Sequence, residues 1–187
     1  MATVFSHIAI PVGIALALGR KRVPKSLMEA GAISSVMADI DCLMFNFGVP
    51  YESQWGHRGF THSIVMAILI GLLWAWRQKE PLVKPRDVFA FTFLCALTHP
   101  ILDALTDGGL GVAFFWPFTD TRYFFPINPL AVSPIGRGFI SLRGMEVFLK
   151  EIVLIWMPCL LVGGAGFAVR KYLLKEAPAE QEKKPSP

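Results

Sequence analysis

The sequence has few cysteines and few charged residues, and both shortages narrow the possible classes of protein. Its three cysteines, Cys42, Cys95 and Cys159, are far apart and form no CxxC pair, so neither a disulfide framework nor a thiolate zinc site is expected. Charged residues make up only 17% of the 187 residues, and the mean hydropathy is +0.50. These values lie outside the usual range of soluble domains and are typical of an integral membrane protein.

The chain is also too short to hold a separate soluble catalytic module. We expect residues 1–170 to form one membrane-embedded domain and the charged, proline-containing residues 171–187 to form a disordered cytoplasmic tail. The net charge of +4 comes from Lys and Arg residues in loops and in this tail. Such an excess reflects membrane topology and anionic headgroups, so membrane lipid is the expected partner and nucleic acid is not.

Apolar runs predict an all-α fold, a polytopic membrane bundle of about five transmembrane helices. The runs cover residues 4–18, 27–47, 62–76, 87–107 and 147–169. The first is short for a span and has a small-residue stretch like a signal-peptide cleavage site, but no basic residue precedes it, so we interpret it as a retained helix. Residues 108–145 are rich in aromatics and proline and predict a long loop in the headgroup zone.

The positive charges predict the orientation of these helices. The loops after the first and third runs and the C-terminal tail hold thirteen of the eighteen Lys and Arg residues. In a five-span chain all three segments lie on the same side, which the positive-inside rule makes cytoplasmic. We therefore expect a multi-pass inner membrane protein with its N-terminus outside and its C-terminus in the cytoplasm.

Ionisable side chains inside apolar helices are costly and mark function. When the runs are placed as helices rising about 1.5 Å per residue, these side chains all fall at one depth near the non-cytoplasmic face. They are His7, Asp39, Asp41, His57, His62, His99, Asp103 and Asp107. This shared depth predicts a single site.

Imidazoles and carboxylates together suit a divalent transition metal, zinc first, with manganese or iron as alternatives. His99 and Asp103 are four residues apart and share a helix face, so they can bind one ion together. The predicted metal ligands are His7, Asp39, Asp41, His62, His99 and Asp103. Asp39 and Asp41 can bridge two ions or bind one while orienting a histidine, so one or two ions are expected.

Catalytic roles are predicted for His57 and Asp41. His57 lies in a glycine-flanked loop and can act as a ligand or as a general acid that protonates the leaving oxygen. Arg58 and Arg122 are predicted to bind a substrate phosphate through paired hydrogen bonds. The structural alternatives are a polar helix entrance at His7, a hydrogen-bonded helix pair at His99 and Asp103, headgroup anchors at the arginines, and a solvated helix end at Asp107.

Across residues 1–170 the chain carries an early Ser-His, Asp-x-Asp, His-Arg-Gly-x-Thr-His-Ser, His-Pro-x-Leu-Asp with Thr-Asp-Gly-Gly, and Trp-Pro-Phe. This combination resembles the YdjM-like family of LexA-regulated, membrane-bound, metal-dependent hydrolases. Family members often carry Pro before the first Asp and His after the second. Those positions are Ala38 and Cys42 here, so one possible ligand is absent. The resemblance implies a hydrolase of a bacterial or archaeal inner membrane.

The hypothesis is a membrane enzyme that cleaves an ester or phosphoester bond, plausibly in a lipid, by means of a metal-activated water. One alternative is a metal-binding transporter component, which would need polar residues toward the cytoplasmic half of the helices. Few are found there, namely Glu29, Ser34, Ser35 and Thr92. The other alternative is a non-enzymatic protein with an inert metal site.

Overall fold

The computed structural model describes residues 1–78, 83–134 and 136–181, so part of the second basic loop and the last residues of the tail lie outside the described residues. The elements are α1 (Val4–Leu18), α2 (Lys25–Val36), the 3-10 helices η1 (Met37–Phe47) and η2 (Phe60–His62), α3 (Ile64–Arg77), α4 (Pro85–Ala104), the 3-10 helix η3 (Gly136–Phe139), α5 (Leu142–Glu151), the π-helical turn η4 (Ile152–Trp156) and α6 (Met157–Gln181).

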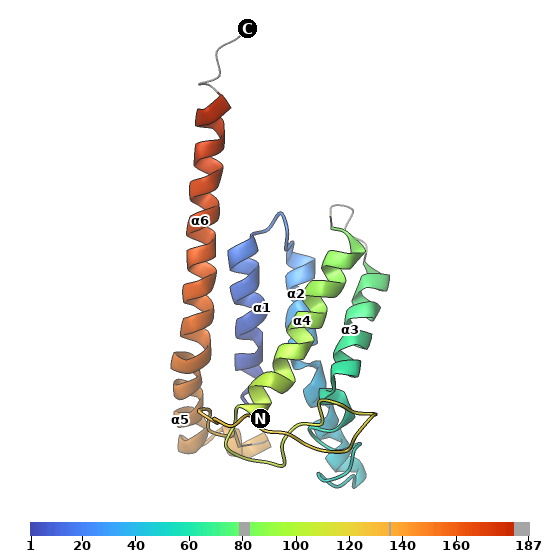
Figure 1. The fold of residues 1–187 in the computed structure, drawn as a ribbon. Coiled ribbons are helices and arrows are strands. Elements are labelled where there is room, and N and C mark those ends of the chain that lie inside the picture. Colours follow the sequence, from blue (N-terminus) through green and yellow to red (C-terminus); the bar gives the residue numbers. More distant parts are fainter. Residues whose placement is uncertain (79–82, 135, 182–187) are drawn as a thin grey trace.

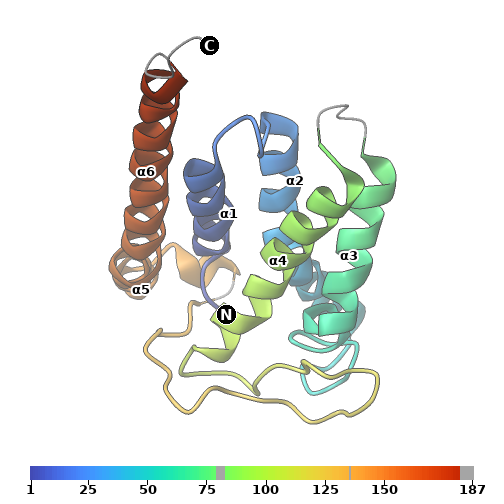
Figure 2. The same cartoon turned by 45° about the horizontal axis from the view of Figure 1, so that its top comes forward.

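Helices α1, α2, α3, α4 and α6 lie side by side in an up-and-down bundle (Figure 1). Over the described ranges the chain forms no strand, only isolated bridges between Thr106 and Leu130 and between Val112 and Tyr123. The predicted all-α class is therefore confirmed. The loop between α4 and α5 crosses beneath the lower ends of the helices, on the side where the N-terminus lies (Figure 2).

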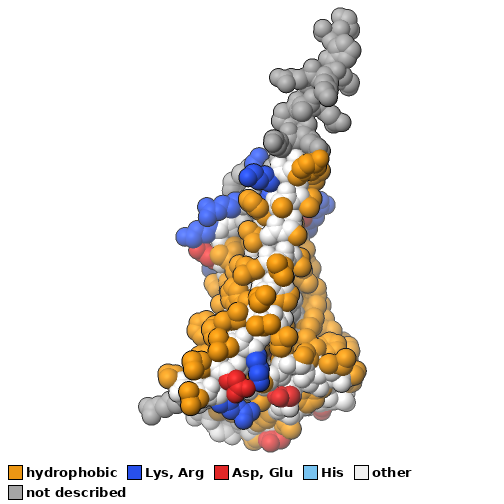
Figure 3. Space-filling model, turned by 90° about the vertical axis from the view of Figure 1, so that its left-hand side faces the viewer, with side chains coloured by type: hydrophobic (Ala, Val, Ile, Leu, Met, Phe, Trp, Pro, Cys, Tyr) orange, Lys and Arg blue, Asp and Glu red, His pale blue; other side chains and the backbone are white. Residues whose placement is uncertain are grey.

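Two helical stretches in the described chain are long and apolar enough to cross a membrane, Pro85–Ala104 and Leu142–Leu173. Helices α1 and α3 are apolar but shorter. Helix α2 has 12 residues, about 18 Å of helix at 1.5 Å per residue. The predicted number of five spans is therefore not confirmed by length and apolarity. Apolar side chains cover the outer face of α6, while charged ones gather toward its ends (Figure 3).

The second apolar run does not form the single helix that the sequence predicts. The hydroxyls of Ser34 and Ser35 bond back to the carbonyls of Ala30 and Ala32, a pattern that often bends helices. The chain then tightens into η1. Residues two apart diverge by about 160° in an α-helix but by about 120° at three residues per turn, so this winding brings the two aspartates of Asp-x-Asp closer to one side.

Helices α1 and α6 pack through small residues. A Cβ built on Gly13 would lie 2.8 Å from the carbonyl oxygen of Cys159, and one on Gly163 would lie 2.7 Å from the carbonyl oxygen of Gly13. One on Gly166 would lie 2.7 Å from the Cβ of Ala17. The two backbones are therefore in direct contact, as small residues permit in membrane helices.

Ser63 caps the start of α3, because its Oγ accepts a hydrogen bond from the Met66 amide at 3.1 Å. Helix α6 continues to Gln181, and the rest of the tail that the sequence predicts as disordered lies outside the described residues.

Candidate metal centre

The ionisable residues of the bundle meet at its lower end, where α1, α4, η1 and η2 converge. His7, His57, His62 and His99, all four histidines of the chain, are at most 1% exposed. Asp41 and Asp103 are equally buried, whereas the side chain of Asp39 is 9% exposed. The structure thus brings together all the residues predicted as metal ligands, from four separate segments.

Four of them form a compact set of donor atoms, contributed by Asp39, His62, His99 and Asp103, with these atoms within 4.8 Å of one another. The Nε2 atoms of His62 and His99 are 3.1 Å apart. Asp39 Oδ1 lies 3.3 Å from His99 Nε2, and Asp103 Oδ2 lies 3.5 Å from His62 Nε2. Two ligands about 2.0–2.1 Å from one tetrahedral zinc ion would lie about 3.3 Å apart, so the spacing fits one ion.

The hydrogen bonds of the two imidazoles fix where their lone pairs point. His99 Nδ1 lies 2.7 Å from the carbonyl oxygen of Ser35, which can only accept, so Nδ1 carries the proton. His62 Nδ1 lies 3.1 Å from the carboxylate of Asp41 and donates in the same way. With both rings neutral and protonated at Nδ1, each ring presents its Nε2 to the other at 3.1 Å. That is the usual arrangement of metal-binding histidines, with an ion bound between the two Nε2 atoms.

Several buried polar atoms in this region lack a hydrogen-bond partner among the described residues. They are both carboxylate oxygens of Asp39, both ring nitrogens of His7 and Nε2 of His57. Such atoms are rare in folded proteins and call for an explanation such as an ion. A cation bound by Asp39 would satisfy the most costly of them, because an uncompensated buried charge is strongly unfavourable.

His7 lies at the edge of this set. Its ring stacks on that of His99 with centroids 3.7 Å apart, and its Nε2 is 3.6 Å from Asp103 Oδ1. It is therefore close enough to complete the ligand set, or to support His99 by stacking. Both readings keep it within the centre.

A second group of possible ligands adjoins the first and shares Asp39 with it. Here Asp41 Oδ1 lies 2.7 Å from His57 Nδ1, and Cys42 Sγ lies 3.5 Å from the same nitrogen. Asp41 Oδ2 also lies 3.1 Å from His62 Nδ1. Asp41 therefore lies between two imidazoles and is suited to orient both.

The two arginines predicted to bind substrate are bonded to the protein instead. Arg58 is fully buried, and its guanidinium donates from Nε to Asp103 Oδ2 at 3.2 Å and from Nη1 and Nη2 to Gly108 and Thr106. In this geometry Arg58 positions a ligand carboxylate. The sequence could not show this, because the partners of Arg58 lie at the C-terminal end of α4 and in the loop that follows it.

Arg122 and Asp107 also bond neighbouring loops. Arg122 donates to the carbonyl oxygens of His57, Tyr51 and Ser53 at 2.8–3.1 Å, which holds the loop that carries His57. Asp107 is exposed and accepts from the Val132 amide at 2.7 Å. It therefore lies outside the donor set, in agreement with the structural alternative for this residue.

Sequence reasoning missed Glu151, which is 1% exposed and lies immediately before the π-helical turn. Its carboxylate accepts hydrogen bonds from the Thr3 amide at 2.8 Å, from the Thr3 hydroxyl, and from Ser6 Oγ at 2.6 Å. The neighbouring Ala2 amide donates to Asp103 Oδ1 at 2.8 Å. Glu151 thus fixes the start of α1 against the centre. An acidic residue inside an apolar run was the available signal.

A cavity of about 250 Å³ reaches the centre, and its lining includes Asp39 and Cys42 together with Thr3, Val4 and Phe139. Among the four residues of the compact donor set, Asp39 is the one that lines this cavity. It is therefore the ligand that a bound molecule would meet first.

Comparisons with known proteins identify the family of the chain. The family model of the YdjM inner membrane protein matches residues 1–173. The inner membrane protein YbcI of Escherichia coli (strain K12) is 37% identical over 169 residues, which cover 88% of this chain and 96% of YbcI. The inner membrane protein YdjM of the same strain is 29% identical over 109 residues, 58% of this chain and 51% of that protein. No solved structure matches the chain. The chain therefore belongs to the YdjM family of inner membrane proteins.

Proposed function

We propose that this protein is a five-pass inner membrane hydrolase that uses a divalent transition metal to cleave an ester or phosphoester bond at the non-cytoplasmic face. The observation that carries the proposal is the pair of Nε2 atoms of His62 and His99, 3.1 Å apart and flanked by Asp39 and Asp103. Two imidazoles and two carboxylates suit zinc, with iron and manganese as alternatives. The second group around His57 leaves room for one ion or two.

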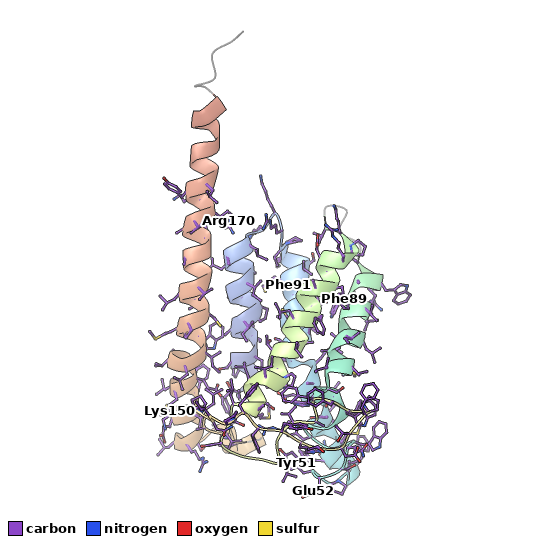
Figure 4. All side chains as sticks on the ribbon, in the orientation of Figure 1. Tyr51, Glu52, Phe89, Phe91, Lys150 and Arg170 are labelled. Carbon is purple, nitrogen blue, oxygen red and sulfur yellow. The ribbon has the colours of Figure 1, made fainter. Side chains whose placement is uncertain are left out.

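The charge distribution supports the five-pass topology with the N-terminus outside. Arg170 on α6 lies toward the end of the bundle opposite Tyr51 and Lys150 (Figure 4). The loop that follows α1, the end of α3 and the start of α4 lie at the Arg170 end as well (Figure 1). Since basic segments stay in the cytoplasm, the metal centre belongs to the outer leaflet. In this topology α1, α2 and α3 cross the membrane together with η1 and the loops beneath them.

A divalent ion in this site would supply Lewis-acid chemistry, lowering the pKa of a coordinated water and stabilising negative charge on the substrate. Four protein ligands fill a tetrahedral coordination shell, so one of them would have to leave the ion before water or substrate could bind. Asp39 is suited to this, because it faces the cavity and neither of its oxygens is hydrogen-bonded within the described chain. A displaced Asp39 carboxylate would accept a proton from the attacking water.

In this proposal the His57 imidazole protonates the leaving group. Its Nδ1 is bonded to Asp41, and its buried Nε2 has no partner among the described residues. Asp41 would stabilise the protonated ring, so that Nε2–H donates a proton to the departing oxygen. The predicted catalytic roles of His57 and Asp41 are part of this proposal.

A second candidate function is a structural metal site in a non-enzymatic membrane protein. The four-ligand set favours it, because closed tetrahedral sites are usually structural. Metal content and hydrolysis, measured on the same sample, separate the two.

The test uses detergent-purified full-length protein. Elemental analysis is expected to find stoichiometric zinc, iron or manganese, and His99→Ala is expected to abolish both metal content and hydrolysis in a screen of ester and phosphoester substrates. Glu146→Gln is the control, because Glu146 is exposed and pairs with Lys150. Stoichiometric metal without any hydrolysis would support the structural site. A metal-free wild-type protein would refute both functions.

A further inference from the structure

Two hollows at the metal-centre end share one side chain, that of Phe139. The first is the cavity of about 250 Å³ that ends at Asp39. The second is a groove of about 480 Å³ along the start of α5, lined by Ile140, Leu142, Met145 and Phe148. Phe139 lines both, so the groove and the cavity adjoin at this side chain, and the cavity has a candidate ligand, Asp39, in its lining.

The groove is apolar and opens outward. Ile140 is 88% exposed and Leu142 is 82% exposed. Leu142 begins the continuous helix Leu142–Leu173, which contains an apolar window long enough to cross the membrane. In the proposed topology this start of the helix lies at the outer membrane boundary, so the exposed apolar side chains of the groove meet lipid there.

The cavity has a different character at its inner end. There the Asp39 carboxylate and the Ser133 side chain join the lining. A volume of about 250 Å³ is below the range of about 300–1,000 Å³ that holds a complete small-molecule ligand. The cavity alone therefore fits only the reacting polar end of a molecule, and the remainder must extend into the groove.

Three aromatic rings lie where the two hollows adjoin, and a molecule that extends from one hollow into the other has to pass them. The rings of Phe5 and Phe139 have centroids 6.1 Å apart, and those of Phe5 and Phe148 are 6.0 Å apart. Phe5 lines the cavity and Phe148 the groove. A molecule in this passage would meet three aromatic side chains, which excludes a chain of charged or strongly hydrated groups.

We infer that an acyl chain of a membrane lipid lies in the groove, and that its ester or phosphoester end passes Phe139 into the cavity beside Asp39. The cleavage of that bond rests on the proposed function, but the placement of the chain does not. The substrate class is thereby an amphiphile taken from the outer leaflet, rather than a soluble ester.

The experiment uses the full-length protein in vesicles of phosphatidylethanolamine and phosphatidylglycerol. The vesicles contain a phospholipid with a photoactivated diazirine next to its ester carbonyl. After illumination, the labelled residues are mapped by mass spectrometry, with and without a metal chelator. Labelling is expected in the cavity-lining segments around Val4 and around Cys42, and along the groove, in both samples, because it requires no hydrolysis.

Two variants narrow the passage. Phe139→Trp is expected to remove most of the labelling around Cys42, and Val4→Trp, at a side chain that is 43% exposed, is expected to do the same if the first variant does not fold. Leu161→Trp is the control, since Leu161 is 69% exposed on α6. Absence of cavity labelling in the wild type, or labelling that persists in both folded passage variants, would overturn the inference. Cavity labelling without hydrolysis would support it and count against the proposed enzyme.

Discussion

Replacing Asp41 with asparagine tests whether this carboxylate orients the metal-binding histidine or binds the ion itself. Asp41 Oδ1 accepts from His57 Nδ1 at 2.7 Å. Its Oδ2 accepts from the Thr61 hydroxyl and the Arg58 amide, and it lies 3.1 Å from His62 Nδ1. Asparagine retains one of the two oxygens, and its NH₂ group would point at a donor in either orientation.

The expected loss of zinc affinity is moderate, because Asp41 orients the histidines rather than binding the ion. Loss of a partner that orients a metal-binding histidine typically lowers metal affinity by about 10–100-fold, or about 1.4–2.7 kcal/mol. Loss of a ligand costs more. We therefore expect Asp41→Asn to weaken zinc binding within this range and His99→Ala to weaken it further.

The assay is a competition titration of the purified protein with a chromogenic zinc chelator. Asp107→Asn is the matched control, because Asp107 is exposed and its bond from the Val132 amide needs only one oxygen. Its zinc affinity should equal that of the wild type. An Asp41→Asn protein with unchanged affinity, or one that loses zinc as fully as His99→Ala, would refute the reasoning about Asp41.

Three further predictions concern pH, stability and topology. Zinc affinity should fall as the pH is lowered, because imidazole ligands must be neutral to bind; equal affinities at about pH 5.5 and pH 7.5 would contradict this. Glu151→Gln should lower the melting temperature in detergent, at a cost of about 1–3 kcal/mol from weakened hydrogen bonds, and an unchanged melting temperature would show that these bonds stabilise nothing. Alkaline phosphatase should be active when fused after Asp120 and inactive when fused after Arg22, and the reverse pattern would invert the topology.

The gathering of ionisable residues could be predicted because it depends on simple chain geometry. The ends of apolar runs locate the ends of helices, and a rise of 1.5 Å per residue then gives the depth of each side chain. His99 and Asp103, four residues apart on α4, needed no further information. The donor set of the structure contains both of them together with Asp39 and His62.

The features of the site that the sequence did not predict depend on contacts between segments far apart in the chain. Arg58 resembles a phosphate ligand in the sequence, but its partners Asp103 and Thr106 lie 45 and 48 residues away. Glu151 lies 148 residues from Thr3, with which it bonds. No local pattern identifies such partners.

The glycine contacts between α1 and α6 have a consequence for the depth of the centre. Gly13 and Gly163 bring the two backbones together, and no rotamer change can absorb a slide of one helix along the other. The height of Glu151 relative to Thr3 and Ser6 is thus set by main chain, and the height of His7 with it. A larger side chain in the part of the α1–α6 contact that lies farthest from the centre would displace the His7 imidazole without contacting it.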